Sequence, residues 1–332
     1  MSAEGKDGQV ADGDAASDAD SLDLVRPPSP VNQPGTGVFS VLWGRPYSNQ
    51  LWTYRFPVDQ DEVTRLDRVH QAIRSAGLTF GPVDVLLDNP QRWPRLLDVG
   101  CGSGMWLTEV AVQFPRVDCV GIDFLEQQHV NAPRNVTFMQ VNVPRGMGVL
   151  AAGSFDVVHI RQMIYAIPDY AGMLAQAYRV LRPGGILLIH EPNLLCYSAW
   201  QEYTPEQLGP ALVQWSLAFR HGLSQRGVDM NVFNRMEQLA AAAGFTMTHP
   251  PHFHYHPLAP GNDNSEAQNE TECTRALVAA SRITIVEGGE YTHDTFSVLE
   301  GEVHAELDGH GAGGARARGL YSPWGFWWVR KE

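Results

Sequence analysis

Short apolar runs alternate with amphipathic stretches between residues 95 and 191, and this alternation constrains the fold more than any other feature of the chain. The apolar runs predict strands at 95–99, 118–122, 136–141, 155–160 and 186–191, and the stretches between them predict helices near 105–113, 145–151 and 170–181. Strands and helices that alternate in this way form right-handed βαβ units. The sequence therefore predicts a doubly wound α/β fold whose mostly parallel sheet is covered by helices on both faces.

The rest of the chain divides into additions to this core. Residues 1–36 hold seven acidic side chains and a proline-rich end, which is typical of a disordered acidic tail. Residues 37–92 are dense in aromatic side chains and continue with apolar residues at helical spacing from 61 to 75, which predicts an N-terminal helical cap. The main domain is assigned to 93–332, with a helical insertion at about 256–322. Its second half is expected to hold helices at 207–221, 232–243, 266–287 and 293–307, and a short strand at 245–249.

Charge and composition argue against several kinds of partner. The net charge of −13 disfavours binding to nucleic acid or to anionic lipid, because such binding depends on clustered Lys and Arg. No run of about eighteen apolar residues predicts a membrane span, and no segment resembles a secretion signal. The four cysteines are widely spaced, as in a reducing compartment. We expect a cytoplasmic protein, with the nucleus as the alternative.

A glycine-rich turn follows the first predicted strand. The segment Leu96–Gly104 runs from apolar residues through Asp98 into Gly100, Gly102 and Gly104, and a predicted helix comes next. Glycine lets the backbone turn tightly and approach a ligand closely, and the first amides of the helix face the same place. Taken alone, the pattern also fits an ordinary strand-to-helix turn, so a second feature is needed to decide.

That second feature is Asp123, which ends the next predicted strand. A carboxylate there can accept hydrogen bonds from both ribose hydroxyls of a nucleoside bound over the glycine turn. A dinucleotide is one alternative, but its fingerprint is Gly-x-Gly-x-x-Gly, and the third glycine here comes one residue early. Asp98 would also repel a pyrophosphate, whereas it suits the cationic amino end of methionine. We therefore predict S-adenosylmethionine as the ligand.

The chain resembles the fungal LaeA-like methyltransferases, within the class I S-adenosylmethionine-dependent superfamily. The resemblance covers nearly everything after residue 40. It rests on Gly44-Arg45-x-Tyr47, on the glycine turn with Trp106 and Gln113-Phe114-Pro115, on Val120-Gly121-Ile122-Asp123, on Phe155-Asp156 with His159-Ile160-Arg161, and on Leu181-Arg182-Pro183-Gly184-Gly185. It implies a Rossmann-like sheet of seven strands.

The resemblance also implies roles for individual residues. Tyr47 should close over the cofactor, Trp106 should line its pocket, and Arg161 should lie beside its methionine end. Asn142 and Val143 should bracket the adenine, although family members commonly have an acidic residue where Asn142 stands. With the residues argued above, the predicted cofactor-binding set is Tyr47, Asp98, Gly100, Cys101, Gly102, Gly104, Trp106, Asp123, Phe124, Asn142, Val143 and Arg161.

Few residues are candidates for chemistry or metal binding. Methyl transfer from a sulfonium depends mainly on proximity and alignment, so it does not require a catalytic base. Glu191, at the end of a predicted strand, is our single candidate for orienting or deprotonating the acceptor. His252, His254 and His256 would share one face of an extended strand, which suggests metal ligands, but histidines so spaced at a rim or surface are commoner. We therefore predict no metal site.

Two functions follow from these features. The first is methylation of a small or medium organic acceptor, such as a fungal secondary metabolite, at oxygen, nitrogen or sulfur. The second is a LaeA-like regulator of secondary metabolism, which binds the cofactor but acts through protein partners. The acidic tail is compatible with both.

Overall fold

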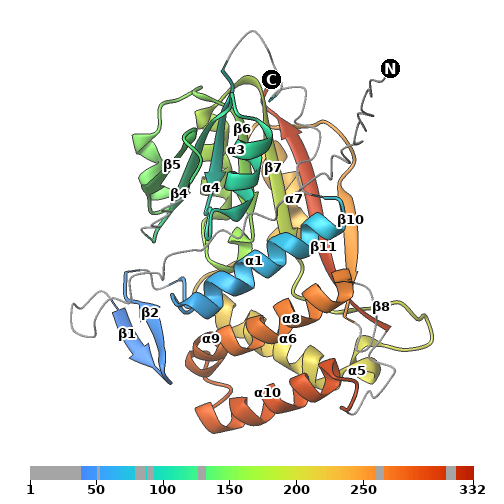
Figure 1. The fold of residues 1–332 in the computed structure, drawn as a ribbon. Coiled ribbons are helices and arrows are strands. Elements are labelled where there is room, and N and C mark those ends of the chain that lie inside the picture. The colour runs from blue at the N-terminus through green and yellow to red at the C-terminus, as the bar shows by residue number, and fades with distance from the viewer. Residues whose placement is uncertain are drawn as a thin grey trace, which may run out of the picture.

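The computed structural model describes residues 39–50, 53–78, 87, 93–125, 132–258, 265–311 and 319–332. The predicted acidic tail, 1–36, lies outside these residues. Figure 1 shows a twisted sheet with helices on its faces and a second group of helices gathered below it, with α1 between the two. Among the residues described, no helix has both the length and the apolar character needed to cross a membrane.

One large sheet organises the fold. Its main path has the order β10-β11-β7-β6-β3-β4-β5, and the short strands β8 and β9 pair with β11. The bounds are β3 Arg95–Val99, β4 Asp118–Asp123, β5 Val136–Gln140, β6 Phe155–Arg161, β7 Leu181–Pro192, β8 Tyr197–Ser198, β9 Thr246–Met247, β10 His252–Pro257 and β11 Leu320–Arg330. Strands β3 to β7 are parallel, whereas β11 is antiparallel to β7 and to β10. The main path confirms the predicted doubly wound, mostly parallel sheet of seven strands.

The order in which strands are added to the sheet reverses between β3 and β6. These two strands are neighbours in the sheet, although β4 and β5 come between them in the sequence. In an open α/β sheet, a ligand binds in the crevice at such a switch point, outside the carboxyl ends of the strands. The strands around it are fully buried, as their apolar sequences require: Leu97, Val99 and Ile160 have no exposed surface. The glycine turn and Asp123 therefore lie where a ligand is expected.

The helices mostly match the predictions, and the differences have local causes. Helix α3 is Met105–Gln113, α4 is Tyr170–Val180, α7 is Val232–Ala242 and α10 is His293–Leu307. The predicted helix at 145–151 is only a 3-10 turn, η1 Arg145–Val149, because Gly146 and Gly148 weaken a helix. The helix expected at 207–221 divides at Pro210 into α5 Pro205–Leu208 and α6 Pro210–Ser224, since proline begins a helix readily but does not continue one.

The other predicted long helix, 266–287, is also two helices, α8 Ser265–Ala280 and α9 Arg282–Glu287, which meet at Ser281. The strand expected at 245–249 keeps only the two residues of β9. Helices α8, α9 and α10 come between β10 and β11 in the chain. They pack with α6 to form the lower helical group of Figure 1.

The N-terminal extension contains the predicted helix and, before it, two strands that were not predicted. It begins with a hairpin of β1 Phe39–Leu42 and β2 Arg45–Ser48, and α1 Gln60–Ser75 follows. The two-residue turn has positive φ at both Trp43 and Gly44, which is the backbone geometry of tight hairpins. A short 3-10 turn, η2 Met163–Tyr165, completes the described elements.

Asp59 joins the hairpin to α1. Its Oδ1 accepts a hydrogen bond from the Glu62 amide at 3.0 Å and so caps the helix. The same carboxylate accepts two hydrogen bonds of 2.7 Å from the Arg45 guanidinium. The bidentate pair, whose side chains are both about one-fifth exposed, fixes where α1 begins relative to the hairpin. This placement matters because α1 crosses the edge of the sheet that carries the glycine turn.

Candidate active site

The glycine turn is held to the neighbouring strand by the backbone. The amides of Gly100 and Cys101 both donate to the Ile122 carbonyl, at 2.8 and 3.0 Å. Gly100, Gly102 and Gly104 all have positive φ, between +52° and +69°, which side-chain-bearing residues rarely adopt. At Gly100 a Cβ would also overlap the sulfur of Met163. Both the shape of the turn and its close approach to η2 therefore require glycine.

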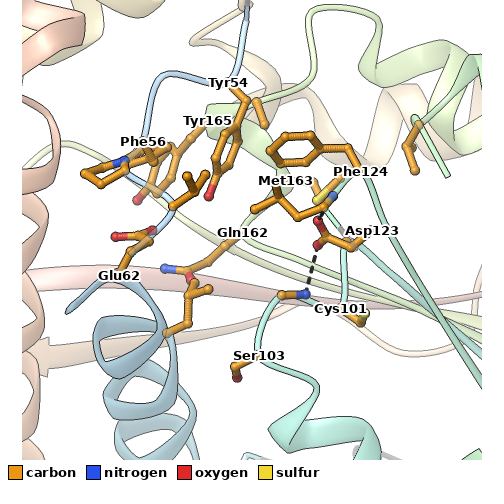
Figure 2. A pocket seen from close by; sticks show the side chains of 18 of the residues that line it. Tyr54, Phe56, Glu62, Cys101, Ser103, Asp123, Phe124, Gln162, Met163 and Tyr165 are labelled. Carbon is orange, nitrogen blue, oxygen red and sulfur yellow. Dashed lines mark hydrogen bonds between the residues drawn. The ribbon is translucent and has the colours of Figure 1, made fainter. Parts of the chain in front are cut away.

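Asp123 faces the glycine turn across the switch point. Its Oδ2 accepts a hydrogen bond from the Gly102 amide at 3.0 Å, and its Oδ1 accepts one from the Leu125 amide at 3.0 Å. Figure 2 shows the carboxylate at the end of β4, directed at the glycine turn. Burial raises the pKa of Asp123 to about 6, and the two backbone hydrogen bonds oppose that rise. At neutral pH the residue is therefore an oriented carboxylate whose other lone pairs are available to a ligand.

A cavity of about 640 Å³ opens between the carboxyl edge of the sheet and α1. This is within the usual size range of small-molecule sites. One part of its wall is the glycine turn with Asp123, Asn142 and Val143. Another part is aromatic: Tyr54, Phe56, Phe124 and Tyr165 lie together in Figure 2, and the Tyr54 ring is 4.7 Å from that of Phe124. We call these four side chains the aromatic wall.

A buried ion pair lies beside the aromatic wall. The Arg65 guanidinium donates two hydrogen bonds to the Glu62 carboxylate, at 2.9 and 2.7 Å, and both side chains are only 4% exposed. The guanidinium also lies over the Phe56 ring, 5.6 Å from its centre. Because the two charges neutralise each other, this part of the cavity has no net charge.

The structure brings together most of the predicted cofactor-binding residues. Those that line the cavity are Gly100, Cys101, Gly102, Asp123, Phe124, Asn142, Val143 and Arg161. Arg161 approaches the Nδ1 of His70 at 3.2 Å, and His70 in turn contacts Glu109 at 3.0 Å, so α1 and α3 hold this arginine in place. Four predicted residues are not among the lining residues: Tyr47, Asp98, Gly104 and Trp106.

Three of these four support the cavity from behind. Gly104, with φ +69°, is the N-cap of α3 and so starts the helix. Asp98 Oδ1 and His159 Nδ1 share a hydrogen bond of 2.7 Å, and the Trp106 ring stacks on that imidazole, with ring centres 3.6 Å apart. Burial disfavours both charges, so the pKa of Asp98 is raised to about 7 and the pKa of His159 is lowered. This buried layer lies beneath the glycine turn and fixes its position.

Tyr47, expected to close over the cofactor, is 1% exposed and lies within β2, where its backbone forms an isolated bridge with Pro57. Its neighbour Pro46 and the residues of the following segment line the cavity instead. The structure thus places Tyr47 behind the cavity wall. Tyr54 and Phe56, seven and nine residues further along the chain, line the cavity.

Glu191, the candidate for orienting an acceptor, is fully buried and does not line the cavity. Its carboxylate accepts hydrogen bonds from the amides of Met163 and Ile164 and from the Tyr170 hydroxyl, at 2.9 to 3.2 Å. Burial raises its pKa to about 8, and these three hydrogen bonds oppose the rise. In this position Glu191 holds η2 against the sheet, and η2 carries Met163 and Tyr165 to the cavity.

Several lining residues were not predicted from the sequence. Leu66 on α1 lies beside Gly102, while Gln162 and Met163 extend from the end of β6. Gln162 has φ +55°, a left-handed conformation that sequence patterns do not reveal for glutamine. The position of Gln162 and Met163 directly after a predicted parallel strand was the available signal, because such positions border the ligand crevice.

The family comparison agrees with this geometry. A family described as a methyltransferase domain matches residues 68–249, more than half of the chain. The chain belongs to this methyltransferase family. Membership confirms the predicted methyltransferase, the class of enzyme for which S-adenosylmethionine is the predicted cofactor.

Named relatives are found among fungal proteins. The chain is 30% identical over 198 residues to "Secondary metabolism regulator laeA" of Coprinopsis cinerea, covering 57% of this chain and 49% of that protein. It is 34% identical over 139 residues to "Methyltransferase str2" of Strobilurus tenacellus, covering 42% of this chain and 48% of that one. The chain thus spans about half the length of the curated relatives it matches. A solved structure of a putative sarcosine dimethylglycine methyltransferase from Galdieria sulphuraria is 14% identical, with a TM-score of 0.44, and the match covers 80% of this chain and 86% of that one.

The lining residues suit this cofactor. The Asp123 oxygens each accept one backbone hydrogen bond, and a carboxylate can accept further bonds, here from ribose hydroxyls. The glycines leave room for close approach, and Asn142 with Val143 borders the same part of the cavity, where adenine would lie. Arg161 lines the cavity near Gly100, where the methionine end of the cofactor is expected to lie.

Cofactor affinity should depend on pH through Asp123. The pKa of this residue is raised to about 6, so the carboxylate is ionised above that pH and gains a proton below it. Protonation removes the charge and one acceptor site, and we therefore expect affinity for S-adenosylhomocysteine to fall as the pH is lowered from 7.5 to 5. Titration calorimetry at several pH values measures this change. In Asp123→Asn the fall centred near pH 6 should disappear, and its persistence there would assign it to another group, such as Asp98.

Proposed function

We propose that the chain transfers the methyl group of S-adenosylmethionine to a small or medium organic acceptor of fungal secondary metabolism, at oxygen, nitrogen or sulfur. The observation that carries the proposal is the continuity of the cavity. Eight of the residues predicted to bind the cofactor and the aromatic wall line one space of about 640 Å³, so an apolar acceptor bound against the wall would share it with the cofactor. The relatives named as methyltransferases or as regulators of secondary metabolism support the acceptor class.

The residues of the chain would act mainly by positioning. S-adenosylmethionine supplies an electrophilic methyl group carried by a sulfonium. Asp123 and the glycine turn would fix the nucleoside, while the aromatic wall would exclude water and hold the acceptor in line with that methyl group. Glu62 and Arg65 neutralise each other, so neither is available to pair with a charged acceptor. This favours an uncharged acceptor.

Incubation of the purified full chain with methyl-labelled S-adenosylmethionine and a metabolite extract of the host tests the proposal. We expect the label to appear in one discrete small molecule that can be recovered by chromatography. Gly102→Val protein serves as the control that should give no product. Two other outcomes would instead favour the LaeA-like regulator, the function suggested by the name of the Coprinopsis cinerea relative. In the first, the label appears only in protein. In the second, no methyl group is transferred and a partner protein co-purifies stably with the chain.

We further propose that the segment around Tyr54 forms a cap over the cavity and that Tyr47 supports it from behind. Tyr54→Ala removes a ring from the aromatic wall and should lower kcat/KM by about tenfold or more, because the acceptor loses a contact and water enters. Tyr47→Ala leaves a void among buried residues and should cost about 3–5 kcal/mol of stability, with the rate per folded molecule retained at low temperature. Thermal denaturation and steady-state kinetics on both variants distinguish the roles. Equal kinetic losses would contradict this division.

A further inference from the structure

A cluster of two histidines and one glutamate lies outside the cavity, between β10 and the first turn of α8. Alternation along β10 directs His252, His254 and His256 to one face of the strand, and α8 packs against this strand. There Glu266 meets the last two histidines. Its Oε1 lies 2.6 Å from Nε2 of His254 and 3.0 Å from Nδ1 of His256. One ligand atom from each of the three residues falls within 4.8 Å of the others.

The burial of His256 is a second, independent observation that points to a ligand at this cluster. Its side chain is 0% exposed, and neither ring nitrogen has a hydrogen-bond partner among the residues that the structure describes. The contact of its Nδ1 with Glu266 is close but does not have the geometry of a hydrogen bond. Buried polar groups are nearly always satisfied, since an unmet one costs free energy. The imidazole therefore lacks a partner that a ligand bound at the cluster would supply.

We infer that His254, His256 and Glu266 bind a divalent cation of the zinc class. Two imidazole nitrogens and one carboxylate oxygen are a donor set that zinc accepts readily, with water completing the tetrahedron. Magnesium and calcium prefer oxygen donors alone, so they suit this set poorly. Donor atoms on a tetrahedral zinc lie about 3.3 Å apart, given bond lengths of about 2.0–2.1 Å. Glu266 would thus need to withdraw from both imidazoles, from 2.6 and 3.0 Å, to admit the ion, while the two imidazole nitrogens already lie within 4.8 Å of each other.

The bound ion would strengthen the link between two parts of the chain that otherwise meet through packing and the contact of His254 with Glu266. It would tie β10 to the N-terminal turn of α8, and α8 packs along α1, whose Leu66 borders the glycine turn. None of the three ligands lines the cavity, so the ion would stabilise the scaffold of the active site without touching the reacting groups. The strand spacing of the histidines alone did not reveal the site. Glu266 follows His254 by twelve residues and comes close to it only in the folded chain.

Calorimetric titration of zinc chloride into the full chain, freed of affinity tag and treated with chelator, tests the site. We expect one ion per chain and a rise in Tm on binding, with no comparable response to magnesium. His254→Ala and Glu266→Gln should each weaken binding by at least about tenfold. His249→Ala, an exposed histidine outside the cluster, is the matched control and should bind as the wild type does. Cobalt should give the intense visible absorption of a tetrahedral site in the wild type and lose it in the two ligand variants.

The inference is overturned if the wild type binds no zinc at micromolar concentration, or if the three variants all bind it equally well. It is also overturned if cobalt gives only the weak spectrum of a hydrated ion. These readouts do not involve methyl transfer, so the result for the metal site is independent of the proposed function.

Discussion

Gly102→Val should abolish measurable binding of S-adenosylmethionine while the protein remains folded. Gly102 lines the cavity and has φ +52°, a conformation that a β-branched residue adopts only with strain. A Cβ there would lie 3.1 Å from Leu66, so the valine side chain would project among the lining residues. The Gly102 amide would also be displaced from Asp123, to which it donates at 3.0 Å. We expect affinity, measured by calorimetry, to fall by more than about a hundredfold.

Gly153→Val separates the effect on the ligand from the effect on the backbone. Gly153 has φ +62°, close to that of Gly102, but a Cβ there meets no atom within 4 Å and the residue does not line the cavity. Both variants should lose similar stability, on the order of 1–2 kcal/mol, because both force a side chain into the left-handed region. Only Gly102→Val should lose the cofactor. Unchanged affinity in Gly102→Val would remove the glycine turn from the site.

Asp123→Ala is the second change for which we expect a large effect. The proposed ribose contacts are charge-assisted hydrogen bonds, which contribute about 1.5–3 kcal/mol each. The substitution also frees the amides of Gly102 and Leu125, which the carboxylate now orients. We therefore expect affinity for S-adenosylmethionine to fall by more than about tenfold.

Asp123→Asn is the matched variant, because it keeps the size of the side chain and one carbonyl acceptor while it removes the charge. Its affinity should lie between those of the wild type and of Asp123→Ala. If both variants bound as tightly as the wild type, the ribose would have to lie elsewhere in the cavity.

Much of the fold could be predicted because its signals are local. Helix α3 and helix α10 have the predicted bounds, and β3 begins and ends as expected, since an apolar run bounded by a glycine turn has few alternatives. The hairpin of β1 and β2 was missed because its turn depends on the positive φ of Trp43, which a bulky residue seldom adopts. The break at Pro210 does have a sequence signal, and the prediction of one continuous helix overlooked it.

The site was predictable where the backbone defines it and not where tertiary packing does. Asp123 and the glycines were identified because they end a parallel strand or allow a turn. Asp98 and Glu191 also lie at or near strand ends, but whether a carboxylate there faces a ligand depends on what packs over it. Asp98 faces His159, and Glu191 faces the amides of η2. The aromatic wall comes from segments distant in sequence, so its assembly could not be read from spacing.

Diffraction from crystals of the full chain grown with S-adenosylhomocysteine tests most directly the central claim, that this cavity binds the cofactor next to an acceptor space. We predict density for one ligand in the cavity, with its ribose hydroxyls within hydrogen-bond distance of Asp123. Its adenine should lie beside Asn142 and Val143, and its sulfur should face the space in front of the aromatic wall. Density for the ligand outside the cavity, or a ribose that does not contact Asp123, would contradict the account.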